Sequence, residues 1–182
     1  MTGALLAWSD LQVGDAQCRD VVEAVRPRSV DDWLIVAGDV AELAADVEWA
    51  LGLLAGRFAK VGWTPGNHEL WTHPNDQVTL RGVQRYQPLL GATRSLGTAS
   101  KADGLAHADE TGVVYSDEHL LRPDPYPTRA RAVVYGPLHI PRRVSYDGVR
   151  FIESSVGYPL EWTFFGGPFG PRQVLPATPE AG

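Results

Sequence analysis

The sequence has 182 residues, which is enough for one domain with a hydrophobic core and short for two. With 16 basic and 22 acidic residues the net charge is -6, and no dense lysine or arginine cluster is present, which argues against a nucleic-acid partner. The single cysteine, Cys18, excludes an internal disulfide, and no signal peptide or apolar run of about 20 residues occurs, so we expect a cytoplasmic protein that does not bind membranes.

Strand and helix patterns alternate in the first third of the chain. Residues 4–9 form an apolar run typical of a buried strand, and residues 15–26 follow with apolar side chains at helical spacing. Residues 32–37 predict a second buried strand, residues 43–58 a second helix and residues 60–64 a third strand. This alternation predicts an α/β protein with a mostly parallel N-terminal sheet and helical crossovers.

The second half of the chain is less regular. Residues 78–87 predict a helix that the following proline disturbs, and residues 97–110 are small and polar, as in a linker. Residues 130–136 predict an apolar strand, and residues 144–155 predict a hairpin with an Asp-Gly turn. The tail, residues 163–182, is rich in glycine and proline, so we expect it to be disordered.

Polar side chains follow the predicted strands at the points where the strands end. Asp10, Asp39 and the pair Asn67 and His68 each come directly after one of the first three strands, and His139 follows the strand at residues 130–136. In open α/β sheets, functional groups collect in the loops at the carboxyl ends of the strands. We therefore expect these side chains to meet along one edge of the sheet.

Together these groups would suit a metal site. Two carboxylates held close together repel each other, and a cation relieves that repulsion. Oxygen donors from Asp10, Asp39 and Asn67, with a nitrogen donor from His139, favour Mn, Fe or Zn over calcium. His68 could protonate a leaving group, because an imidazole titrates near neutral pH. Taken singly, an aspartate after a strand is more often a helix N-cap, and a lone histidine is more often a structural residue.

Four short stretches occur in a characteristic order: SDLQ at residues 9–12, AGDVAE at 37–42, PGNHE at 65–69 and GPLH at 136–139. They resemble the ordered signature of the calcineurin-like metallophosphoesterases. The resemblance implies a four-layer αββα sandwich, incomplete in this chain. It also implies hydrolysis of a phosphate ester or phosphodiester, in which a metal pair clamps the phosphate and activates a water.

Longer stretches are similar to an actinobacterial branch of that family, which includes a hydrolase that removes the phosphopantetheine arm from acyl carrier proteins. They are DDWLIVAGDVAE, WTPGNHELWTHPND, VTLRGVQRY, DEHLLRPDPYP, VVYGPLHIPR, DGVRF and GYPLEW. The resemblance implies a phosphate-ester substrate, and the phosphopantetheine arm is one candidate. Acyl carrier proteins are typically acidic, so this acidic chain would need a local basic face, for which the candidates are Arg122, Arg129, Arg142 and Arg143.

The sequence departs from the family pattern in three places. Gln12 stands where the family has the histidine of its first motif, and Pro137 stands where it has the first histidine of its last motif. The strand that should end in another histidine is missing. We therefore expect a single domain over residues 1–162 with a shortened middle at about residues 97–130.

These departures reduce the number of metal ligands that the resemblance implies. For one metal the chain supplies Asp10, Asp39 and His139, with Gln12 as a neutral substitute, and three protein ligands are a normal number for a catalytic zinc ion. For the second metal it supplies only Asp39 and Asn67. The expectation is one divalent ion and no stable pair, with Asn67 orienting the phosphate and His68 acting as the acid.

Three functions remain open from the sequence. The first is a weakened phosphoesterase with at most one metal. The second is a non-catalytic pseudoenzyme that binds or regulates a partner, because the histidine replaced by Pro137 and the histidine of the missing strand both belong to one metal. The third is a metal-free enzyme repurposed for specialised metabolism.

Overall fold

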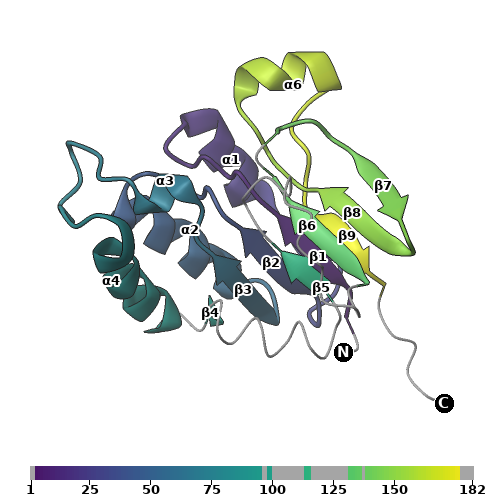
Figure 1. Cartoon of the computed structure of the whole chain (residues 1–182), viewed down its shortest axis with the longest axis horizontal. Coiled ribbons are helices and arrows are strands. Elements are labelled where there is room, and N and C mark those ends of the chain that lie inside the picture. Colours follow the sequence, from purple (N-terminus) through teal and green to yellow (C-terminus); the bar gives the residue numbers. More distant parts are fainter. Residues whose placement is uncertain (1–2, 96–97, 100–112, 116–130, 137, 177–182) are drawn as a thin grey trace.

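The computed structural model describes residues 3–95, 98–99, 113–115, 131–136 and 138–176. Two sheets pack face to face, and helices cover the outer face of the first (Figure 1). In the described residues the first sheet has the strand order β4 (Thr98–Ala99), β3 (Lys60–Thr64), β2 (Trp33–Ala37), β1 (Leu5–Trp8) and β9 (Arg172–Leu175). The second has the order β5 (Val113–Tyr115), β6 (Ala132–Tyr135), β8 (Val149–Glu153) and β7 (Arg143–Tyr146). The helices are α1 (Ala16–Ala24), α2 (Ala44–Ala55), α3 (Asn67–Leu70), α4 (Gly82–Ser95) and α6 (Pro159–Phe165).

The first sheet confirms the predicted parallel pairing. β1, β2, β3 and β4 run parallel in that sequence, and only β9 pairs antiparallel, with β1. The crossovers between β1, β2 and β3 are the helices α1 and α2. Asp15 caps α1 by accepting hydrogen bonds from the backbone N–H groups of Gln17 (2.8 Å) and Cys18 (3.2 Å). The hairpin of β7 and β8 was also predicted, and its turn residues Asp147 and Gly148 both have positive φ.

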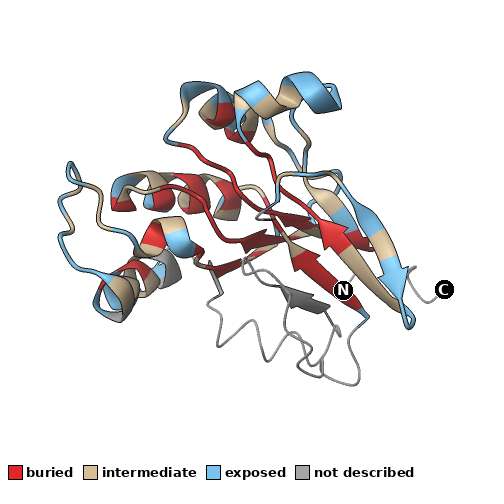
Figure 2. Cartoon of the chain, turned by 45° about the horizontal axis from the view of Figure 1, so that its top comes forward, coloured by how far each residue is buried: buried red, intermediate tan, exposed pale blue. Residues whose placement is uncertain are grey.

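Apolar side chains form two layers of core, one on each face of the first sheet. One layer packs the sheet against the helices and includes Trp8, Val36, Leu51, Trp63 and Leu89. The other lies between the two sheets and includes Leu5, Ile35, Val134, Ile152 and Val174. Figure 2 shows this burial along the strands of the first sheet and its decline toward β7. No helix in the described part of the chain is long and apolar enough to span a membrane.

Two predictions about the fold were wrong. Residues 163–182 were expected to be disordered, but α6 continues to Phe165 and β9 pairs with β1, where Val174 and Leu175 are buried. The glycines between these elements form the return turn, and residues 177–182 lie outside the described residues. The helix predicted at residues 78–87 begins at Gly82 and continues through Pro88 to Ser95. Burial of Leu89 against the core offsets the loss of the backbone hydrogen bond that Pro88 cannot donate.

The middle of the chain is described only in part. Of the predicted linker at residues 97–110, residues 98–99 form β4 and the remainder lies outside the described residues. Pro137 lies outside them as well.

Candidate functional site

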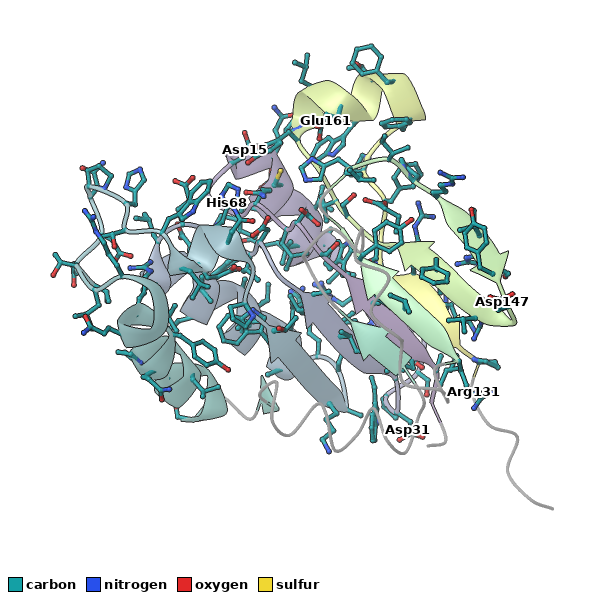
Figure 3. The ribbon with its side chains drawn as sticks, viewed as in Figure 1. Asp15, Asp31, His68, Arg131, Asp147 and Glu161 are labelled. Atoms are coloured by element: carbon teal, nitrogen blue, oxygen red, sulfur yellow. The ribbon has the colours of Figure 1, made fainter. Side chains whose placement is uncertain are left out.

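The predicted site residues lie at one edge of the two sheets. Asp10 follows β1, Asp39 follows β2 and His139 follows β6, whereas His68 lies in the short helix α3 that follows β3. Figure 3 shows His68 at the same edge as Glu161 of α6, whereas Asp31, which precedes β2, lies at the opposite edge. A backbone hydrogen bond joins the loops after β1 and β2: the Asp10 N–H donates to the carbonyl of Gly38 at 3.0 Å. The convergence expected from the strand pattern is therefore present.

The backbone at this edge is unusual. Asp10, Gln12, Asp39 and His139 have φ angles of 50°, 47°, 51° and 49°. Among the described non-glycine residues, only Asp147 in the hairpin turn shares this left-handed conformation. Such conformations are costly for residues with a side chain and cluster at sites of function. Four of the five predicted metal ligands thus stand on strained backbone.

His139 is held between two carboxylates. Its Nε2 lies 2.9 Å from Oδ1 of Asp10, and its Nδ1 lies 2.8 Å from Oε2 of Glu161. The same Glu161 oxygen accepts from the backbone N–H of Tyr158 at 2.7 Å. Burial alone would lower the pKa of His139, but the hydrogen bonds and charges of Asp10 and Glu161 prevail and raise it to about 9. The metal-free imidazole is therefore a cation that donates from both nitrogens.

Two motif glycines allow the loops to approach this closely. A Cβ on Gly136 would lie 1.8 Å from Oδ2 of Asp10, and a Cβ on Gly66 would lie 2.1 Å from Oδ1 of Asp39. Any side chain at either position would displace an aspartate of the site. The glycines of the last and third motifs therefore serve the same purpose, close packing of backbone against a carboxylate.

Asp39 is buried beside His68. Its Oδ1 accepts from the backbone N–H of His68 at 3.1 Å, and its Oδ2 lies 4.0 Å from His68 Nε2. Burial raises the pKa of Asp39, the His68 N–H opposes that rise, and the nearby charge of Asp10 adds to it. Asp39 and Asp10 are thus close enough to repel each other, the condition that a bound cation relieves.

The His68 ring is oriented by its neighbours. It packs on Trp71 with ring centroids 4.4 Å apart, and its Nδ1 lies 3.4 Å from Oε1 of Glu42. That nitrogen is buried and makes no hydrogen bond to any described residue. Asn67, at the start of α3, is exposed, whereas Gln12 is buried, and neither side chain hydrogen-bonds to a described residue.

Residues missed by the sequence prediction hold these loops together. Glu69 is fully buried and accepts from the backbone N–H groups of Gly66 (2.7 Å), Asp39 (3.2 Å) and Val40. Burial and the charge of Asp39 raise the pKa of Glu69 to about 8. The carboxyl of Glu69 therefore links the loop after β2 to the loop after β3.

Arg85 provides the next layer of support. It is completely buried and donates to the backbone carbonyls of Glu69 (2.6 Å), Val78 (2.8 Å) and Glu42 (2.7 Å), and to Oδ2 of Asp76 at 2.5 Å. Asp76 in turn accepts from the N–H of Ala44 at 3.1 Å. Glu69, Asp76 and Arg85 all lie within the stretches that resemble the actinobacterial branch, and Glu161 lies within GYPLEW, so that resemblance was the available signal.

The side chains at this edge supply only part of the ligand set that a single cation needs. In the described segments, no three His, Cys, Asp or Glu side chains stand close enough together to hold a metal ion. Asp10 and His139 form a ready pair of donors, and Glu161 on the far nitrogen of His139 is the kind of carboxylate that orients histidine ligands of metals. An ion would have to displace the proton on Nε2 and draw in Asp39 as the third donor.

Comparison with known proteins decides the family. The family model for calcineurin-like phosphoesterases matches residues 4–148. The chain belongs to the calcineurin-like phosphoesterase family. It is 35% identical, over 269 aligned positions, to the [acyl-carrier-protein] phosphodiesterase PptH of Mycobacterium tuberculosis, with 94% of this chain and 83% of that protein covered. The crystal structure of phosphopantetheinyl hydrolase from the same organism superimposes with a TM-score of 0.76 and 33% identity, covering 100% of this chain and 98% of the other.

The aligned region spans 269 positions, more than the 182 residues of this chain, so the mycobacterial relative has residues within that region that this chain lacks. The family match and the identity to this relative confirm the resemblance drawn from the motifs. The fold of the relative also confirms the metallophosphoesterase architecture.

Proposed function

We propose that this chain hydrolyses a phosphate ester or phosphodiester with at most one divalent metal ion bound, and that its substrate is the phosphopantetheine arm of an acyl carrier protein. The observation that supports this most directly is His139 held between Asp10 and Glu161, at the sheet edge where Asp39 also lies. The PptH relative is named as an acyl-carrier-protein phosphodiesterase, which supports the choice of substrate.

Asp10, Asp39 and His139 would hold the ion, which we propose to be Mn, Fe or Zn. Gln12 offers a neutral fourth donor. When bound, the ion would supply the positive charge that a phosphate ester needs during nucleophilic attack. A second ion would find too few donors, because Pro137 replaces one of its histidines in the family pattern and the chain supplies only Asp39 and Asn67 for it.

The chain's own residues then complete the reaction. Water adds to phosphorus and the bond from phosphorus to the ester oxygen of the carrier protein breaks. The attacking water loses one proton to solvent, and the leaving oxygen needs a proton. His68 is placed to donate it at the edge where Asp39 lies, with its Nε2 4.0 Å from Oδ2 of Asp39 and its Nδ1 3.4 Å from Oε1 of Glu42. Asn67, exposed beside His68, would donate its amide N–H to a phosphate oxygen.

The test uses an acyl carrier protein that carries its phosphopantetheine arm, incubated with the full chain and added Mn, Fe or Zn. Mass spectrometry measures conversion of the carrier protein to its unmodified form. We expect conversion by the wild-type chain, a loss of about 100-fold or more for Asp39→Asn, and no loss for Asp31→Asn at the opposite edge (Figure 3). Wild-type conversion no faster than that of Asp39→Asn would refute the proposal, and unchanged conversion with a chelator would point to metal-free chemistry.

A binding role without catalysis is the second candidate. It is favoured by the direct bond between Asp10 and His139, which satisfies both groups without an ion, and by the absence of a three-donor cluster in the described residues. A ligand that binds only the folded state must raise its stability. A melting temperature that does not change when Mn, Fe or Zn is added would therefore favour this role. An increase in melting temperature with metal that is lost in His139→Ala would exclude it.

A further inference from the structure

An arginine-lined pocket of about 420 Å³ includes Glu153, which is close enough to Asp10 and His139 of the candidate site to interact with their charges. It is formed between the hairpin of β7 and β8 and the segment that leads into β9, elements that lie side by side in Figure 1. Its lining includes Arg142, Arg143, Arg172, Phe169 and Glu153. Of the arginines considered for a basic face, Arg122 and Arg129 lie outside the described residues, whereas the other two line this pocket.

Among the described residues, the arginines of this pocket are not closely paired with carboxylates. In the described part of the chain, no ion pair joins Arg142, Arg143 or Arg172 to a carboxylate within 4.0 Å. Arg172 lies over the ring of Phe169, 4.3 Å from its centroid. Burial lowers the pKa of Arg172, and the charge of Arg143 lowers it further against the pull of Glu153. Three guanidinium groups and one carboxylate, Glu153, leave the described lining of the pocket with a net positive charge that suits an anion.

Glu153 makes the pocket more selective than a basic surface. It is 2% exposed, and its Oε1 accepts from the hydroxyl of Ser155. Its Oε2 is buried and makes no hydrogen bond to any described residue. A buried acceptor without a donor is costly, so a ligand in the pocket that brings an N–H or O–H group gains affinity when the Glu153 side chain turns Oε2 toward it.

We propose that this pocket binds a phosphate group that carries an O–H, with the arginines on the anionic oxygens and Glu153 accepting from the hydroxyl. Inorganic phosphate keeps one O–H near neutral pH, whereas sulfate and a phosphate monoester, which has a second pKa of about 6, present anionic oxygens without a hydroxyl. Arginines alone would not distinguish phosphate from sulfate, and Glu153 provides the distinction. An acidic protein surface would use the arginines but would leave Oε2 unpaired.

The test measures binding by isothermal titration calorimetry on the full chain treated with a chelator, at about pH 8, where phosphate keeps one O–H. Inorganic phosphate and 4′-phosphopantetheine are titrated separately, with sulfate as the comparison. We expect sulfate to bind about 10-fold or more weakly than phosphate, and Arg142→Ala with Arg143→Ala to weaken phosphate binding by a similar factor. Glu153→Gln, whose amide can donate to sulfate, should bring the two affinities within about twofold of each other.

Control measurements separate binding in this pocket from non-specific binding of anions to surface arginines. Arg81→Ala, an exposed arginine at the start of α4, should bind phosphate as the wild type does. We expect 4′-phosphopantetheine, which has no phosphate O–H at this pH, to bind more weakly than inorganic phosphate, and tighter binding of the ester would overturn the proposal. Equal affinities of the wild type for phosphate and sulfate would overturn the proposal, as would binding of an acidic carrier protein through these arginines without any phosphate binding. Because binding is measured without metal or turnover, a failure of the hydrolase proposal leaves this test unaffected.

Discussion

Replacing Glu161 with glutamine isolates the contribution of one carboxylate to the charge state of His139. Glu161 accepts from His139 Nδ1 at 2.8 Å, and Asp10 accepts from Nε2 at 2.9 Å. Together they raise the pKa of His139 from 6.5 to about 9. Glutamine retains a carbonyl oxygen for the Tyr158 N–H but removes the charge, so the fold at α6 should survive.

The size of the effect follows from these contacts. The Glu161 side chain is 37% exposed, so solvent screens its share more than that of Asp10, which is 3% exposed. We expect Glu161→Gln to move the titration midpoint of His139 down by about one pH unit. NMR titration of the imidazole C–H resonances measures it, with Glu48→Gln on the exposed face of α2 as the control.

The same shift predicts how stability depends on pH. Because the pKa of His139 is higher in the folded state, its contribution to the unfolding free energy is complete below pH 6.5 and is lost as the pH rises through about 9. Urea titrations across that window should show a smaller loss in Glu161→Gln than in the wild type. An unchanged His139 midpoint in the variant would refute the reasoning, because it would mean that the Nδ1 contact carries no charge interaction.

The remaining predictions concern the supports of the site and are checked by urea denaturation. Glu69→Ala leaves buried backbone N–H groups without acceptors and should lower the unfolding free energy by about 3 kcal/mol or more. Gly136→Ala forces a Cβ against Asp10 and should cost about 1–3 kcal/mol, whereas Gly14→Ala, with open space around its Cβ position, should be nearly neutral. Arg85→Ala removes the donor to three carbonyls and to Asp76 and should cost about 3–5 kcal/mol; a loss below about 1 kcal/mol would mean that solvent replaces these bonds.

The parallel strands and the convergence of Asp10, Asp39, His68 and His139 were predictable because they depend on local signals. Apolar runs, helical spacing and polar residues at strand ends are each visible over a few positions. The wider architecture came from the motif resemblance, which the comparisons confirm.

The parts that sequence reasoning missed depend on contacts between distant segments. Glu161 reaches His139 across 22 positions, and composition alone could not reveal that partner. β9 was taken for a disordered tail because its neighbours are glycine and proline, yet its pairing with β1 buries Val174 and Leu175. In the same way, Arg142 and Arg172 are 30 positions apart and meet only because the two sheets bring their strands together.

The pairing of β9 with β1 also matters for handling the protein. β1 has β2 on one side and β9 on the other, and Trp8 Nε1 donates to the carbonyl of Phe169 at 2.9 Å. A version cut after α6 would expose the N–H and C=O groups along that side of Leu5–Trp8, and such an open strand readily recruits strands from other molecules. Removing the glycine- and proline-rich segment together with β9 to improve crystallisation or yield would therefore favour precipitation. An affinity tag placed after β9 would leave β9 paired with β1.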